Sequence, residues 1–194
     1  MIIVAFGHES RVGKDTAAKL LDSALRVMNI KTKKVSFAAK LKQVSYDVYG
    51  WTGLKPGLFY ESDEGAKLRS VKLPVINKTP VEIWIDVGNH FREIYENTWR
   101  DYVLNVDHGN TEVLIITDLR FPNEGNGVHE KDGICVHVIA ERVPKMDSVS
   151  DRALDGWPNW DRKLFNEGDI KELSDKVDAF ALNLFAQVRG HQHV

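Results

Sequence analysis

Apolar positions along the first part of the chain follow a strand period and then a helix period. Residues 1–6 form a continuous apolar run that is typical of a buried strand. A helical stripe follows, with apolar side chains spaced by three and four positions: Ala17, Leu20, Leu21, Ala24, Leu25 and Met28. The pattern therefore predicts a strand, a short loop and an amphipathic helix over residues 1–28.

The same alternation continues through the rest of the chain. Strands are expected over residues 34–38, 113–118 and 134–139, and helices after residue 38, from Pro80, from Thr98 and after Asp169. Asp169 and Glu172 have the spacing of a helix cap. Alternating parallel-type strands and helices predict an α/β protein, a three-layer fold with a parallel central sheet and helices on both faces.

Two segments interrupt this alternation. The 194 residues fit a single domain, so we expect one domain over residues 1–194 with two irregular parts. Residues 51–80 mix glycines and prolines with charges, which predicts an insertion on the substrate side. Residues 143–161 contain few aliphatic side chains, and their prolines and glycine predict a lid-like segment.

The junction between the first strand and the first helix reads Gly13-Lys14-Asp15-Thr16. A strand, a loop with Gly-Lys and a helix are the context of a phosphate-binding loop, whose backbone N–H groups and helix N-terminus bind phosphate oxygens. The structural alternative is a Gly-Lys turn that begins a helix and binds no phosphate. His8 stands where the usual pattern has its first glycine, and Asp15 stands where it has a hydroxyl.

Ligands bind at the carboxyl ends of the strands in such sheets, which singles out Asp118, Arg120 and Arg142. Asp118 ends an apolar run, as in a Walker B element, and is a candidate for Mg²⁺; the alternative is an aspartate that caps a turn. Either Thr16 or Asp15 is the second metal ligand expected, and the sequence does not decide between them. Arg142 follows the strand over 134–139.

Arg120 lies two residues after Asp118, so along an extended segment both side chains point the same way. A guanidinium can bind a substrate phosphate through two parallel hydrogen bonds. The alternative is an ion pair with Asp118 or Glu124. Further cations near the middle helices could also meet an anionic substrate, or be solvated surface charges: Lys72, Arg92 and Arg100.

Composition narrows the class of partner. The net charge of −2 provides no global basic field for nucleic acid. The single cysteine, Cys135, lies in an apolar run and is expected to be a buried structural thiol in a reducing compartment. No apolar stretch is long enough for a signal peptide or a membrane span, so we expect a cytoplasmic protein without a membrane partner.

Several motifs resemble those of bacteriophage deoxynucleoside monophosphate kinases, in the family's order and over nearly the whole chain. They are Gly13-Lys14-Asp15-Thr16, Ser36-Phe37-Ala38 with Leu41-Lys42, Asp118-Leu119-Arg120-Phe121-Pro122-Asn123-Glu124, and Phe165-Asn166-Glu167-Gly168-Asp169 with Leu173. The run from Asp118 to Glu124 is the most specific of them.

The resemblance implies a P-loop kinase that transfers the γ-phosphoryl group of ATP to a deoxynucleoside monophosphate with Mg²⁺, in the host cytoplasm if the gene is a phage's. ATP phosphates are then expected on Arg11, Val12 and residues 13–16, with Lys14 catalytic. Asp118 is expected at the metal or a phosphate, and Arg120 at a phosphate. Arg142 and Arg152 are the expected lid arginines. The accepted monophosphates and a homodimer are left open.

Other classes share part of this pattern. A kinase of another small phosphorylated metabolite would have the same loop and lid, and a non-kinase P-loop protein would have the loop alone. A GTPase would carry Asn-Lys-x-Asp, but the run at 77–80 is Asn-Lys-Thr-Pro. A motor-type ATPase usually has a glutamate after the Walker B aspartate, where Leu119 stands here.

Overall fold

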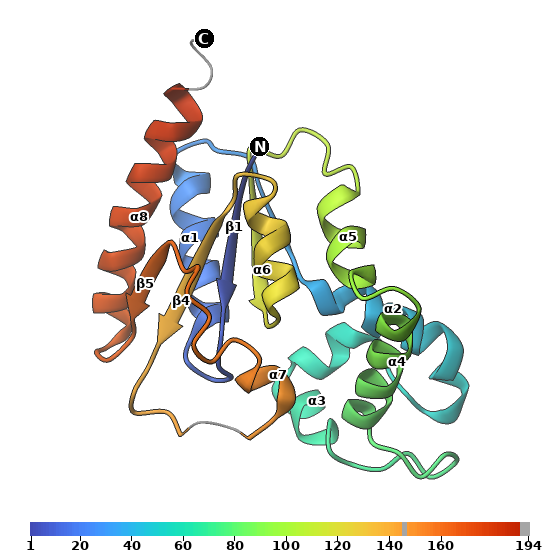
Figure 1. The fold of residues 1–194 in the computed structure, drawn as a ribbon. Coiled ribbons are helices and arrows are strands. Elements are labelled where there is room, and N and C mark those ends of the chain that lie inside the picture. Colours follow the sequence, from blue (N-terminus) through green and yellow to red (C-terminus); the bar gives the residue numbers. More distant parts are fainter. Residues whose placement is uncertain (145–146, 191–194) are drawn as a thin grey trace. The chain divides into compact units, whose positions relative to one another are not determined.

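The computed structural model describes residues 1–144 and 147–190. It is an α/β protein whose five strands are all parallel and lie in the order β2-β3-β1-β4-β5 (Figure 1). The strands are β1 (Ile2–Gly7), β2 (Thr32–Val35), β3 (Val113–Leu119), β4 (Ile134–Ile139) and β5 (Arg162–Phe165). The predicted fold class, α/β with a parallel central sheet, is confirmed.

The chain forms two compact units, Met1–Ser36 with Val103–Val194, and Phe37–Tyr102. The first holds the sheet and the helices α1 (Lys14–Val27), α6 (Pro122–His129), α7 (Val149–Arg152) and α8 (Ile170–Gly190). The second holds α2 (Phe37–Tyr49), η1 (Gly50–Thr52), η2 (Gly57–Glu61), α3 (Asp63–Leu68) and α4 (Pro80–Ile94). The helix α5 (Thr98–Asn105) crosses the boundary between them.

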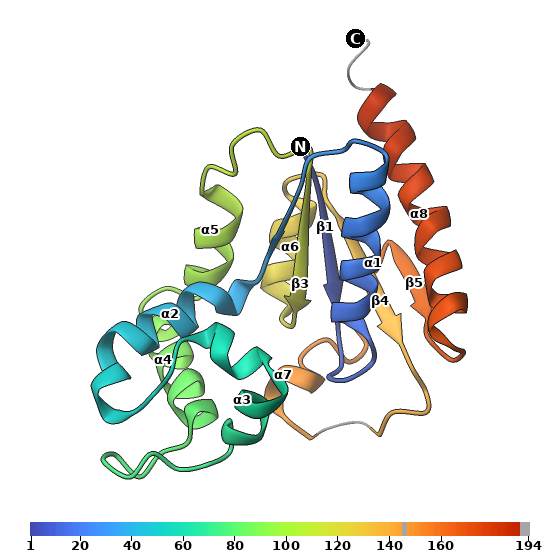
Figure 2. The same cartoon turned by 180° about the vertical axis from the view of Figure 1, so that it is seen from behind.

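The first unit is layered. Helices α1 and α8 cover one face of the sheet, and α6 covers the other (Figures 1 and 2). The central strands β1 and β3 are buried, and Leu21 and Leu25 of α1 pack with Val177 and Leu184 of α8 in the same core. Full burial of such a side chain is worth about 1.5–3 kcal/mol, so this core fixes the carboxyl edge of the sheet where the site lies.

The last helix, α8, has the N-terminal cap that the sequence predicts. The carboxylate of Asp169 accepts a hydrogen bond from the backbone N–H of Glu172 at 2.9 Å, which confirms the predicted cap. One stripe of α8 faces the core. Among the helices that the structure describes, none combines the length and the apolar character that a membrane crossing requires.

The second unit has a small core of its own. Leu54, Tyr60 and Ile83 are buried together, and the ring of Trp84 meets that of Tyr60 edge-on at 5.2 Å. Much of this core comes from residues 51–80, which we expected to be irregular. The segment contains η1, η2 and α3, whose three to six residues are too short to show a helical period in the sequence.

Some predicted boundaries were wrong. Phe37 and Ala38 begin α2 and do not extend the strand, since β2 ends at Val35. The third strand continues to Leu119, so Asp118 lies within β3. The helix α6 was not predicted, because two of its eight residues are glycines and its sequence shows no clear apolar stripe.

Candidate phosphate-binding site

The loop between β1 and α1 lies at the carboxyl edge of the sheet, below the arrowhead of β1 in Figure 1. Its backbone has left-handed φ angles at His8 (87°), Arg11 (64°) and Gly13 (96°). Left-handed residues within such a loop turn successive N–H groups toward one concavity, as in anion-binding nests. Gly13 is the N-cap residue of α1 and has no side chain, so the cap itself does not occupy the helix N-terminus.

Asn166, the residue directly after β5, contacts this loop. Its side-chain amide donates to the carbonyl oxygen of Val12 at 2.9 Å. A Cβ atom on Gly13 would lie 2.4 Å from the same amide nitrogen, so a larger residue would have to displace the Asn166 amide as well as adopt a left-handed φ. Arg142 donates to the Asn166 carbonyl oxygen and lies 3.9 Å from Glu167, so it stabilises the turn after β5.

Lys14, the predicted phosphate-binding cation, is the first residue of α1 and is 6% exposed. Its ammonium donates to the carbonyl oxygen of Glu9 within the loop. Burial, together with the positive charge of Arg120, lowers the Lys14 pKa from 10.5 to about 8, although nearby carboxylates act in the opposite direction. With a pKa of about 8, Lys14 still carries its positive charge at neutral pH.

The oxygen groups predicted to hold Mg²⁺ come from two elements. Asp15 and Thr16 are exposed in the first turn of α1, and Asp118 is near the end of β3. Ser36 donates to the Asp118 carboxylate at 2.6 Å. The charges of Asp15 and Asp118 both act on Lys14. Carboxylate and hydroxyl oxygens suit a hard cation, so this donor set fits Mg²⁺ together with phosphate oxygens.

Arg120 reaches back across the loop. Its guanidinium donates to the His8 carbonyl oxygen at 3.1 Å and to the Ser10 hydroxyl at 3.2 Å, and it forms a close ion pair with Asp151. Nothing in the spacing of the sequence indicated Asp151, which comes from α7. The loop and α7 thus meet at one guanidinium.

Glu124, one of the alternative partners considered for Arg120, has a different role. Its carboxylate accepts from the backbone N–H groups of Arg120 and Phe121, at 2.9 and 3.1 Å. Pro122 at the first turn and Glu124 two residues later fix the start of α6. The most specific run of the sequence therefore combines a helix cap with the placement of Arg120.

His8 stands at the position of the usual glycine and adopts a conformation that glycine favours. It is 5% exposed, and its ring nitrogens lie 3.0 Å from His137 and 3.1 Å from Asp155. A left-handed conformation costs a non-glycine residue about 1–3 kcal/mol, and it persists where surrounding contacts hold it. Here His137 and Asp155 supply those contacts.

The segment expected to be lid-like rests on the sheet edge in its described part; residues 145 and 146 lie outside the described residues. The Trp160 ring stacks on His137 with centroids 4.7 Å apart, and a Cβ on Gly7 would lie 2.7 Å from it. Trp157 stacks on His129 at 5.8 Å. Arg152, a predicted lid arginine, is 65% exposed and pairs with carboxylates of its own segment, at 2.9 Å from Asp147 and 3.5 Å from Asp155.

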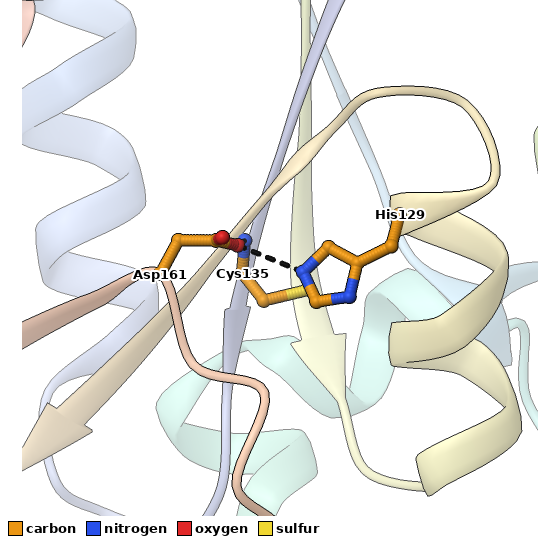
Figure 3. Close-up of side chains that lie close together, drawn as sticks. All are labelled: His129, Cys135 and Asp161. Carbon is orange, nitrogen blue, oxygen red and sulfur yellow. Dashed lines mark hydrogen bonds and ion pairs between the residues drawn. The ribbon is translucent and has the colours of Figure 1, made fainter.

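A second cluster, His129, Cys135 and Asp161, lies on the α6 side of β4 (Figure 3). One oxygen of Asp161 lies 2.8 Å from His129 and accepts from the backbone N–H of Cys135 at 2.7 Å. Burial raises the pKa of the Cys135 thiol to about 12, and the predicted buried thiol is confirmed. Through these two contacts the Asp161 carboxylate joins α6 to β4.

Lys72, Arg92 and Arg100 belong to the second compact unit. Within that unit, Arg100 donates to the carboxylate of Asp101 at 2.7 Å. A contact of any of the three with an anionic substrate stays a prediction.

A scan against models of protein families gave no match, and a search of curated proteins found none that matches significantly.

Gly13→Ala should destabilise the loop because it meets both the left-handed φ and the Asn166 amide. Gly109→Ala is the matched control, since Gly109 has a φ of 64° with nothing within 4 Å of its added Cβ. We expect Gly109→Ala to lower the free energy of unfolding by about 1 kcal/mol and Gly13→Ala by clearly more. Equal losses in urea unfolding would contradict the close approach of Asn166.

If the loop binds ATP phosphates, as the resemblance implies, the lowered pKa of Lys14 predicts that the affinity for ATP depends on pH. Below about pH 8 the ammonium is charged and affinity should be constant; above it, affinity should fall by up to about tenfold for each pH unit. Lys14→Arg keeps its charge and should show no fall below pH 10. Equilibrium binding of a non-hydrolysable ATP analogue between pH 6.5 and 10 measures both, and a flat wild-type profile would contradict the assignment.

Proposed function

We propose that this protein is a kinase that transfers the γ-phosphoryl group of ATP to a deoxynucleoside monophosphate and releases ADP and the diphosphate. The proposal extends to a cytoplasmic enzyme that acts on small molecules, with no nucleic acid or membrane as partner. It is supported by the site at the carboxyl edge of the sheet and by the motifs that resemble the phage kinases.

One observation carries the proposal: two cations contact the same short stretch of loop. The Lys14 ammonium binds the carbonyl oxygen of Glu9, and the Arg120 guanidinium binds the His8 carbonyl oxygen and the Ser10 hydroxyl. Phosphoryl transfer between two phosphorylated molecules needs positioning and charge neutralisation of both, and no nucleophile from the protein. We assign Lys14 and the α1 N-terminus to the ATP phosphates, and Arg120 to the phosphate of the acceptor.

Asp118 and either Asp15 or Thr16 would hold Mg²⁺. When bound, the ion would neutralise charge on the β- and γ-phosphates. The chain itself presents these oxygens near Lys14, on whose pKa the charges of Asp15 and Asp118 act. Ser36 fixes the rotamer of Asp118 by its hydrogen bond to one carboxylate oxygen.

A kinase of another small phosphorylated metabolite is the second candidate. The residues described at the site recognise phosphate groups, and none of those contacts reads a base. The deoxynucleoside monophosphate is preferred because the run from Asp118 to Glu124 and the turn at 165–169 both resemble that family. A coupled ADP-release assay with ATP, Mg²⁺ and a panel of nucleotides and other phosphate monoesters separates the two.

Lys14→Met should remove most of the turnover in that assay. Loss of a charge contact to the transferred group typically costs on the order of 10²–10⁴ in rate. The fold should remain, because the charged form of a buried lysine with a lowered pKa opposes folding at neutral pH. Lys19→Met, the same change at an exposed position of α1, is the control. Near-normal turnover by a folded Lys14→Met protein would refute the phosphate role.

Conservative substitutions should distinguish the role of Asp118 from that of Arg120. Asp118→Asn should raise the Mg²⁺ concentration needed for half-maximal rate, because an amide is a weaker ligand for a hard cation. Arg120→Lys keeps the charge but loses the planar fork, so it should raise KM for the acceptor by about tenfold or more. An unchanged acceptor KM in Arg120→Lys would make Arg120 a purely structural partner of Asp151.

A further inference from the structure

Asp151 is a buried anion held by donors from three segments. It is 4% exposed, and one carboxylate oxygen accepts from the Ser10 hydroxyl at 2.8 Å and from Arg120. The other oxygen accepts from Ser148 at 2.8 Å. A guanidinium, a hydroxyl on the loop and the nearby Lys14 charge therefore surround one carboxylate.

This set of donors is also suited to a phosphate monoester. A guanidinium binds phosphate and carboxylate oxygens with the same fork geometry, and a loop hydroxyl can donate to either. Arg120 is moreover the cation assigned above to the acceptor's phosphate, yet in this structure Asp151 already occupies it. The Asp151 carboxylate and the acceptor's phosphate would therefore compete for the same guanidinium.

We infer that the carboxylate of Asp151 occupies the subsite of the acceptor's phosphate, so that a phosphate monoester must displace Asp151 from Arg120 and Ser10 to bind. The inference rests on the proposed function, since it adds a self-occupied state to the same site. Its ligand is the dianionic phosphate group of the acceptor.

Displacement is feasible because the phosphate would replace the Asp151 carboxylate as the anion bound to Arg120. Removing a partner from a buried ion pair is costly because the remaining charge is left uncompensated, but an incoming phosphate compensates Arg120 at once. Asp151 lies on α7, a helix of four residues outside the sheet, and Ser148 on the same segment remains available to it. The other contacts of the segment, such as Asp155 with His8, involve different groups.

The test is the affinity for inorganic phosphate and for deoxynucleoside monophosphates, measured by titration calorimetry without turnover. Asp151→Asn preserves the shape and removes the competing charge, so phosphate affinity should rise by about tenfold or more. Asp151→Glu restores a competing charge and should return the affinity toward that of wild type. Asp147→Asn removes a carboxylate from the same segment, where it pairs with exposed Arg152, and should leave the affinity unchanged.

A purely structural role for Asp151 predicts the opposite change in phosphate affinity. If Asp151 only orients Arg120, Asp151→Asn should weaken phosphate binding, and that result, or no change, would overturn the inference. Should Asp151→Asn fail to fold, the carboxyl ¹³C resonance of Asp151 in the wild-type protein decides. It should shift in step with phosphate binding, and an unmoved resonance during saturation would overturn displacement.

These outcomes separate the inference from the proposed function. A protein with kinase activity whose Asp151→Asn variant binds the acceptor more weakly would retain the function and lose the self-occupied subsite. A protein that shows no phosphoryl transfer but binds phosphate more tightly as Asp151→Asn would retain the subsite and lose the function.

Discussion

The guanidinium of Arg120 is the interaction on which the rest of the site depends. It joins the carbonyl oxygen of His8, the hydroxyl of Ser10 and the carboxylate of Asp151, and so connects the loop after β1, the end of β3 and α7. The parallel sheet makes this meeting possible because β1 and β3 are neighbours and end at the same edge. The Arg120 side chain is partly buried, with 24% of its surface exposed, and the buried carboxylate of Asp151 supplies the anion that pairs with it.

The loop carries strain that its surroundings compensate. His8 and Arg11 have left-handed φ angles, which L side chains rarely adopt. Contacts of the His8 ring with His137 and Asp155, and of Asn166 with the Val12 carbonyl oxygen, hold the loop from two sides. Such strain is typical of ligand-binding segments, where the backbone must present N–H groups in one direction. A loop held in this way presents its N–H groups to an anion without rearrangement.

Local pattern predicted much of the fold. The strand–loop–helix unit at residues 1–28, the strand over 134–139 and the Asp169 cap could be found because each signal lies within a few residues. The side chains that contact the loop from distant parts of the sequence could not be predicted in this way. Asp151 and Asn166 reach the loop through contacts between residues more than 30 positions apart, and Arg120 with Asp151 is the nearest such pair in sequence. Arg142 and Arg152 carry the positive charge that a lid arginine needs. Their places in the sequence did not predict that Arg142 contacts Glu167 and that Arg152 pairs with Asp147.

A crystal structure with a bisubstrate analogue, adenosine linked through phosphates to a deoxynucleoside, tests the central claim most directly. The account predicts phosphate oxygens on the backbone of residues 9–16 beside Lys14, and the acceptor's phosphate on Arg120 with Asp151 withdrawn. Phosphates bound away from this loop, or an Arg120 still paired with Asp151 beside a bound acceptor, would contradict it.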